Sequence, residues 1–126
     1  MLIEQLSSLT DDLAAFDAWT LTGSEVREAA VAAQKVRTSL DAFLSRVAGA
    51  ADGMGLATDD GATSTTAWLA GLTGVSKGES AKLVAMSRVT TELTGAAWMR
   101  GEVTTDQAGV IMKAIDGLPD WVGDQE

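Results

Sequence analysis

Apolar residues recur along the first part of the chain at the spacing of one helix face. They are separated by four, three, four and three positions: Leu2, Leu6, Leu9, Leu13 and Phe16. Residues so spaced lie on one side of an α-helix, so the pattern predicts a helix near the N-terminus with one apolar face. The stretch 20–23, Thr-Leu-Thr-Gly, then interrupts the pattern. Thr22 and Glu25 have the spacing of a capping box, which predicts the start of a second helix.

The second helix carries the clearest periodicity in the chain. Two sets of apolar residues, each repeating every seven positions, alternate to form a heptad seam: Val26, Ala29, Ala33, Val36, Leu40, Phe43, Val47 and Ala50. A seam of this kind is typical of a helix that packs on another helix. Because the connection before it is short, the pattern predicts an antiparallel helical hairpin over residues 1–51. We expect burial to be greatest at Leu40 and Phe43, near the middle of the seam.

The seam has two candidate partners, another helix of the same chain or a second copy of the chain. Several seam positions are Ala and few charge pairs flank them, which disfavours a freestanding coiled coil. We therefore favour packing within one chain. The alternative is a homodimer through the helical hairpin, with these side chains at its interface: Val26, Val36, Leu40, Phe43 and Val47.

The apolar periodicity weakens after the hairpin. Residues 52–64 contain three Gly and three Asp, which predicts a mobile loop. Residues 65–126 predict a cluster of shorter helices, because residues that end or cap helices recur along them: Gly74, Ser76, Gly101 and Thr104. The chain is thus expected to be a single all-α domain over 1–126. Pro119 suits the first turn of a further helix, so we expect the cluster to be truncated at its C-terminal end.

Composition agrees with a helical fold. Apolar residues make up 46% of the 126 residues and aromatic residues only 5%, with no Tyr and a single Pro. Ala loses no side-chain entropy in a helix and gives a strand little to pack, so this composition favours helices over strands. Every tryptophan lies in a stretch of small residues and is expected to anchor a helix contact. These residues are Trp19, Trp68, Trp98 and Trp121.

The chain contains no His and no Cys. The absence of both residue types excludes a zinc finger, a Cys–His nucleophile pair and a Ser–His–Asp triad. It also excludes the site of an HNH nuclease from this chain, because that site requires His. We predict that this chain is not an enzyme, holds no cofactor and has no evident small-molecule substrate. Glu4, Asp11 and Asp12 interrupt any signal sequence, and no apolar run reaches the length of a membrane span. We therefore expect no membrane partner and a cytoplasmic location.

The formal net charge is −9, from 18 acidic and nine basic residues. An acidic domain repels the phosphate backbone unless its cations cluster, and here they are scattered along the sequence. This charge argues against autonomous DNA binding. The negative charge also disfavours a role of the tryptophans in stacking on nucleic-acid bases. Proteins that bind single-stranded nucleic acid combine aromatic stacking residues with a positively charged groove.

One segment invites a helix-turn-helix interpretation. Ala70 and the turn at Gly74 precede a candidate recognition helix, whose candidate nucleic-acid contacts are Lys77 and Lys82. The motif needs a buried aliphatic residue where this chain has Ser80. We therefore favour a tight corner between two packed helices.

The carboxylates do not predict a metal site. Glu102 and Asp106 lie near a helix start, where the partial positive charge of the N-terminus favours acids for structural reasons. Residues 52–60 lack the ligand alternation of an EF-hand.

A further set of residues between positions 66 and 119 has a recognisable order and spacing. It comprises Trp68-Leu69-Ala70, Thr73-Gly74-Val75-Ser76, Glu79, Ala81, Met99-Arg100-Gly101-Glu102-Val103, Gln107-Ala108, Ile111 and Leu118-Pro119. In this order the chain resembles the actinobacterial 13E12-repeat family (domain of unknown function, family 222). The resemblance implies a helical domain found upstream of HNH endonuclease modules, and it supplies no mechanism.

Two hypotheses from different classes follow. The leading one is a non-catalytic N-terminal module of an HNH-type endonuclease, serving as scaffold, partner contact or DNA-orienting domain. In that case the protein would contact DNA through a nuclease module C-terminal to Glu126. The competing hypothesis is a self-sufficient helical interaction or dimerisation protein without nucleic-acid function, and a weaker third is a helix-turn-helix regulator.

Overall fold

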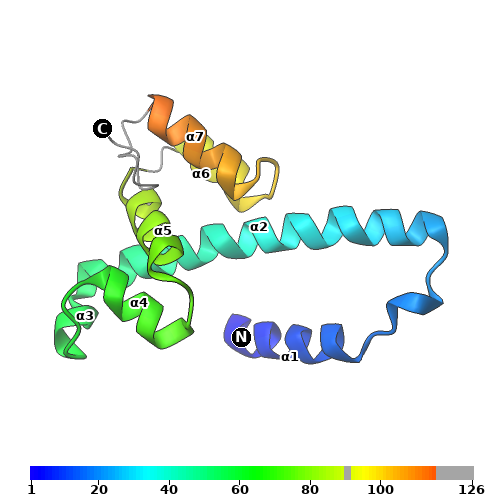
Figure 1. Ribbon diagram of the computed structural model, residues 1–126, viewed down its shortest axis with the longest axis horizontal. Coiled ribbons are helices and arrows are strands. Elements are labelled where there is room, and N and C mark those ends of the chain that lie inside the picture. Colours follow the sequence, from blue (N-terminus) through cyan, green and yellow to red (C-terminus); the bar gives the residue numbers. More distant parts are fainter. Residues whose placement is uncertain (90–91, 116–126) are drawn as a thin grey trace. The chain divides into compact units, whose positions relative to one another are not determined.

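The computed structural model of the chain describes residues 1–89 and 92–115, and these residues form helices and no strand (Figure 1). The elements in order are α1 (Leu2–Ala15), the 3-10 helix η1 (Ala18–Thr20), α2 (Gly23–Met54), α3 (Leu56–Asp59), α4 (Thr65–Thr73), α5 (Lys77–Val89), α6 (Glu92–Met99) and α7 (Thr105–Ile115). The predicted all-α class, with one long helix followed by shorter ones, is confirmed. None of the described helices is both long and apolar enough to cross a membrane.

The chain divides into two compact units, Met1–Ala32 and Ala33–Glu126. The boundary lies inside α2, whereas the predicted division between hairpin and helix cluster followed residue 51. The reason is that the later part of α2 supplies a buried face to the short helices, with buried residues from Thr38 to Ala51.

The first unit contains α1, η1 and the start of α2. The predicted capping box is confirmed: the Thr22 N–H donates to Glu25 Oε1 at 2.9 Å, and the Glu25 N–H donates to Thr22 Oγ1 at 3.2 Å. No side chain between Met1 and Ala32 is buried. Trp19 is 95% exposed, so the prediction that every tryptophan anchors a helix contact is wrong for this residue.

The predicted loop at 52–64 is wrong for most of its length. Helix α2 continues to Met54, Gly55 turns the chain with a left-handed φ of 71°, and α3 follows at Leu56–Asp59. Asp52, one of the residues that suggested a loop, has structural partners: it accepts a hydrogen bond from Thr65 and lies 3.7 Å from Arg88. The glycine and aspartate content of this segment therefore did not predict its conformation, because contacts of Asp52 with α4 and α5 accompany the helical end of α2.

The predicted helix ends and caps of the second unit are confirmed. Gly74 and Gly101 follow α4 and α6 with φ values of 82° and 72°. Ser76 caps α5 by accepting the Glu79 N–H at 3.1 Å. Thr104 caps α7 in a reciprocal box with Gln107, at 3.1 Å and 2.9 Å. The predicted helix around Pro119 lies outside the described residues.

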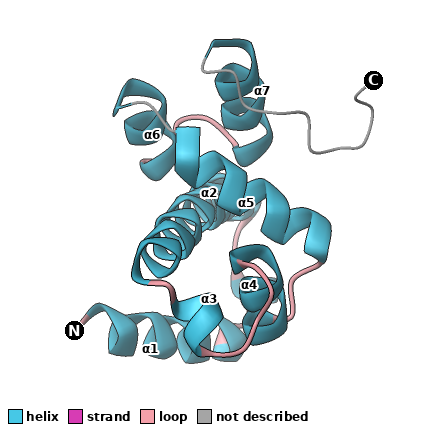
Figure 2. Cartoon of the chain, turned by 90° about the vertical axis from the view of Figure 1, so that its left-hand side faces the viewer, coloured by secondary structure: helices cyan, strands magenta, loops and turns pink. Residues whose placement is uncertain are grey.

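The core of the second unit is built on a small-residue face of α2. Thr38, Ala42, Ser45 and Ala48 are buried, and the Ser45 hydroxyl donates to the Leu83 carbonyl of α5 at 2.7 Å. Larger side chains from the shorter helices complete the apolar cluster: Leu69, Leu83, Val84, Met86, Trp98 and Met112. In Figure 2, α3 and α4 lie on one side of α5, and α6 and α7 on the other.

A polar chain links three helices across this core. The Trp98 indole N–H of α6 donates to Thr105 Oγ1 at 3.0 Å, and the Thr105 hydroxyl donates to Asp41 Oδ2 of α2 at 2.6 Å. Trp98 is 1% exposed, so its N–H would be unsatisfied without this partner. The expectation that Trp98 anchors a helix contact is confirmed.

The close approach between Gly101 and α2 predicts a large effect of a single methyl group. A Cβ at Gly101 would lie 2.7 Å from the Lys35 carbonyl oxygen, and the backbone there has a positive φ. We expect Gly101→Ala to lower the free energy of unfolding by about 1–3 kcal/mol. Gly53→Ala is the matched control, because it lies in α2 with open space around the added methyl. It should be neutral or stabilise by up to about 1 kcal/mol. Urea denaturation measures both, and equal effects would contradict this packing.

Candidate functional site

The predicted seam of α2 lies on the face that the short helices leave uncovered. Thr38, Ala42 and Ser45 each follow a seam residue by two positions, about 200° around the helix. Leu40 is 40% exposed and Phe43 half-buried, so the expectation that burial peaks at these two residues is wrong for the single chain. The heptad periodicity marks the large apolar residues of α2, but the residues of α2 that are buried in the core are the small ones. Small side chains are buried there because they let the helix backbones approach closely.

The remaining seam residues are also exposed. Val36 and Val47 are 44% and 38% exposed in the second unit, and Val26 is 50% exposed in the first. Exposed apolar side chains scattered singly need no explanation, but a row along one helix face is a feature of interaction surfaces. We call the exposed residues Val36, Leu40 and Val47 the seam face.

The predicted helix corner forms as a tight turn. The Gly74 N–H donates to the Ala70 carbonyl at 2.9 Å and closes α4. Ser80 is fully buried, and its hydroxyl donates to the Thr66 carbonyl of α4 at 2.7 Å. A helix-turn-helix motif needs a buried aliphatic side chain at the position of Ser80. In this chain the Ser80 side chain instead forms a hydrogen bond that joins α5 to α4.

The two lysines predicted as nucleic-acid contacts are not brought together. Lys77 is exposed at the first position of α5. The side chain of Lys82 is only 18% exposed, and its Nζ lies 2.6 Å from Asp106 Oδ1 of α7. Five residues of helix separate the directions of the two side chains by about 140°. Among the described residues, Lys77 forms no ion pair, whereas the charge of Lys82 is balanced by the Asp106 carboxylate.

The candidate acids are held by cations. Arg100 donates two hydrogen bonds to Glu102, at 2.8 Å and 2.9 Å, and these bonds lower the pKa of the Glu102 carboxyl. The hydrogen bond from Lys82 likewise lowers the pKa of Asp106. Residues 1–89 and 92–115 contain no group of three acidic side chains arranged to hold a metal ion.

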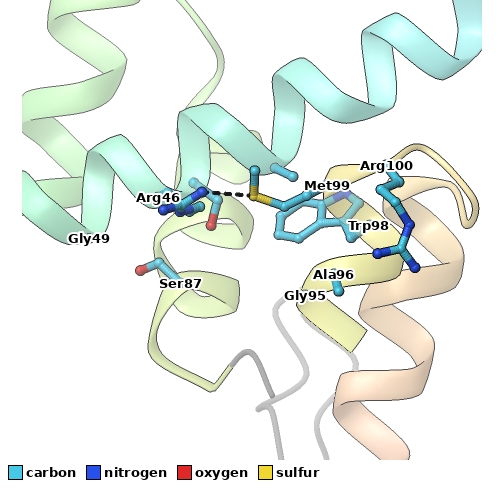
Figure 3. Close-up of a pocket in the computed structure, with 10 residues that line it drawn as sticks. Arg46, Gly49, Ser87, Gly95, Ala96, Trp98, Met99 and Arg100 are labelled. Atoms are coloured by element: carbon cyan, nitrogen blue, oxygen red, sulfur yellow. Dashed lines mark hydrogen bonds between the residues drawn. The ribbon is translucent and has the colours of Figure 1, made fainter. Parts of the chain in front are cut away.

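A cavity of about 800 Å³ lies between α2, α5 and α6. Sequence reasoning did not identify it, because its residues come from three elements and follow no local motif. Figure 3 shows Arg46 and Arg100 at opposite ends of the view, with Met99 and Trp98 between them. The other candidate stacking residues do not join it: Trp68 is half-buried and donates to Asp60 Oδ2 at 2.8 Å, and Trp121 lies outside the described residues.

Comparison with known families agrees with the helix punctuation. Residues 24–125 match the family model described as Domain of unknown function (DUF222). The chain belongs to the DUF222 family. The match covers most of the described fold, from the start of α2 onward, and this family's description names no activity. No curated protein and no solved structure matches the chain.

The ion pair between α5 and α7 predicts an acid-sensitive contact in this DUF222 chain. We expect NMR titration to give Asp106 a pKa below its ordinary value, moving back toward that value in Lys82→Met. Because the folded pKa is the lower one, the pair stabilises the fold above the unfolded pKa and loses that contribution as pH falls through the folded pKa. Lys77→Met is the control and should leave the Asp106 pKa unchanged. The same titration in all three proteins would disprove the pairing.

Proposed function

We propose that this chain is a non-catalytic helical module of an HNH-type endonuclease, and that it contributes a scaffold or protein contact. The observation that carries the proposal is the seam face, a row of exposed large apolar residues on a helix whose other side is fixed in a core. The HNH association rests on the resemblance of residues 66–119.

The chemistry of the chain favours a supporting role. No His is present to act as general base or metal ligand. Glu102 and Asp106 are engaged with Arg100 and Lys82, and an acid held by a cation is a weaker base than a free one.

A protein contact is favoured over DNA contact by the distribution of charge. The net charge of −9 disfavours binding to phosphates, and Lys82 has its charge balanced by Asp106. The seam face offers apolar side chains, which give affinity to protein interfaces rather than to nucleic-acid backbones.

We expect purified residues 1–126 to leave supercoiled and linear DNA intact in the presence of magnesium, manganese or zinc ions, because the chain has no His to activate water. Glu102→Gln, Asp106→Asn and the control Glu79→Gln should behave like the parent protein. Metal-dependent cleavage that is lost in Glu102→Gln or Asp106→Asn and kept in Glu79→Gln would overturn the non-catalytic role.

The coding sequence after Glu126 tests the HNH part of the proposal. An in-frame segment with the His and Asn residues of an HNH site supports it. A segment encoding a different catalytic class, or a stop codon at this point, contradicts it and leaves the second candidate.

That second candidate is a self-sufficient protein that dimerises through α2. A specific observation favours it: an antiparallel pairing of two α2 helices about position 38 places large residues against small or medium ones at every layer. The facing pairs are Val26 with Ala50, Ala29 with Val47, Ala33 with Phe43, and Val36 with Leu40.

For this dimer we expect a melting temperature that rises with protein concentration, because association stabilises the fold by mass action. Leu40→Asp should convert it to a folded monomer in sedimentation experiments, since it places a charge in the apolar interface. The control is Val31→Asp, because Val31 is 63% exposed on α2 but off the seam. A parent protein that sediments as a monomer, with a melting temperature independent of concentration, would exclude this candidate.

A further inference from the structure

The cavity between α2, α5 and α6 has the dimensions of a ligand site. Its volume of about 800 Å³ falls within the range of about 300–1,000 Å³ found for small-molecule pockets. Small residues line it on both helices: Ala42 and Gly49 on α2, and Gly95 and Ala96 on α6. Ala42 and Gly95 are buried, and Gly49 lies against Ser87. Met99 and Ala96 are half-buried and offer apolar surface to a hydrocarbon or aromatic group, whereas Trp98 is 1% exposed and offers almost none.

The two arginines that line this cavity, Arg46 and Arg100, differ in their hydrogen-bond and ion-pair partners. Arg100 is held by Glu102 through two hydrogen bonds. Arg46, from α2, donates from Nη1 to the Met99 sulfur at 3.1 Å and forms no ion pair with any residue in the described ranges. A thioether is a weak acceptor, and a guanidinium has five N–H donors, so this contact orients Arg46 without using its hydrogen-bonding capacity.

Of the two arginines that line the cavity, Arg46 is the one without an ion pair to a described residue, a property that it shares with Arg27, Lys35, Arg37 and Lys77 elsewhere in the chain. Acidic residues outnumber basic ones by 18 to nine, yet within the described residues Arg46 donates its side-chain hydrogen bond to a sulfur atom and not to a carboxylate. A carboxylate on a ligand would supply the charge and the planar, two-oxygen geometry that a guanidinium matches.

We propose that this cavity binds a small molecule in which a carboxylate is attached to an apolar group. Arg46 receives the carboxylate at the rim, and the apolar group lies against the half-buried Met99 and Ala96 of α6. A nucleic-acid strand fits less well, because single-strand sites combine stacking with a row of cations, and Arg100 is already paired. This inference is independent of the proposed module and dimer functions.

The experiment compares 4-phenylbutyrate with its neutral analogue 4-phenylbutyramide by NMR titration of the full chain labelled with ¹⁵N. Binding should shift the backbone amides of Gly49, Ser87 and Ala96, which line the cavity. The carboxylate should bind about tenfold more tightly than the amide, as expected for one charge-assisted hydrogen-bonded pair.

Three variants locate the site. Arg46→Gln should remove the preference for the carboxylate while keeping the weaker apolar binding. Ala96→Leu should abolish binding of both probes, because it fills the cavity. Arg27→Gln is the control, since Arg27 does not line the cavity, and it should retain the full preference.

Several results would overturn the proposal. These are equal binding of acid and amide by the parent protein, an unchanged preference in Arg46→Gln, or no shift of the cavity amides up to the solubility limit of the probe. Binding of an acidic peptide without binding of 4-phenylbutyrate would assign the cavity to a protein partner and would also overturn it. The spectra of the variants report directly whether each is folded.

Discussion

The close approach of the short helices to the small-residue face of α2 is the constraint on which the second unit depends. Thr38, Ala42, Ser45 and Ala48 present little volume, so α2 lies against its neighbours at backbone range. Ser45 bonds directly to a carbonyl of α5, and Gly101 lies against the backbone of Lys35. Larger side chains at these positions would separate the helices and open the cluster around Trp98 and Met86.

This arrangement also explains what the protein presents outward. The face of α2 that carries small residues points into the core. The larger apolar residues on its opposite face are therefore exposed to solvent in a single chain. The seam face and the cavity beside Arg46 are thus two consequences of the same packing. The seam face arises where large residues are exposed to solvent, and the cavity where small residues of α2 and α6 line the space between these helices.

Local signals in the sequence predicted the helix boundaries well. Thr22 with Glu25, Ser76 with Glu79, and the left-handed Gly74 and Gly101 depend on short-range stereochemistry, and the structure has each where expected. The assignment of faces failed, because a heptad pattern ranks residues by size and cannot show that a core will select Ala42 over Leu40. The loop predicted at 52–64 failed for a related reason, since the tie between Asp52 and Thr65 comes from tertiary structure. The pairing of Lys82 with Asp106 and the position of Arg46 beside Met99 likewise join residues that are distant in sequence.

The hydrogen-bonded chain from Trp98 through Thr105 to Asp41 gives the protein an intrinsic optical reporter. Indole emission depends on the polarity around the ring, and Trp98 sits where α2, α6 and α7 meet with 1% of its surface exposed. Trp19 is already in water, so its emission stays nearly constant when the core loosens. A red shift in the fluorescence of this protein would therefore register loosening of the core around Trp98, together with that around the half-buried Trp68, without any label being attached.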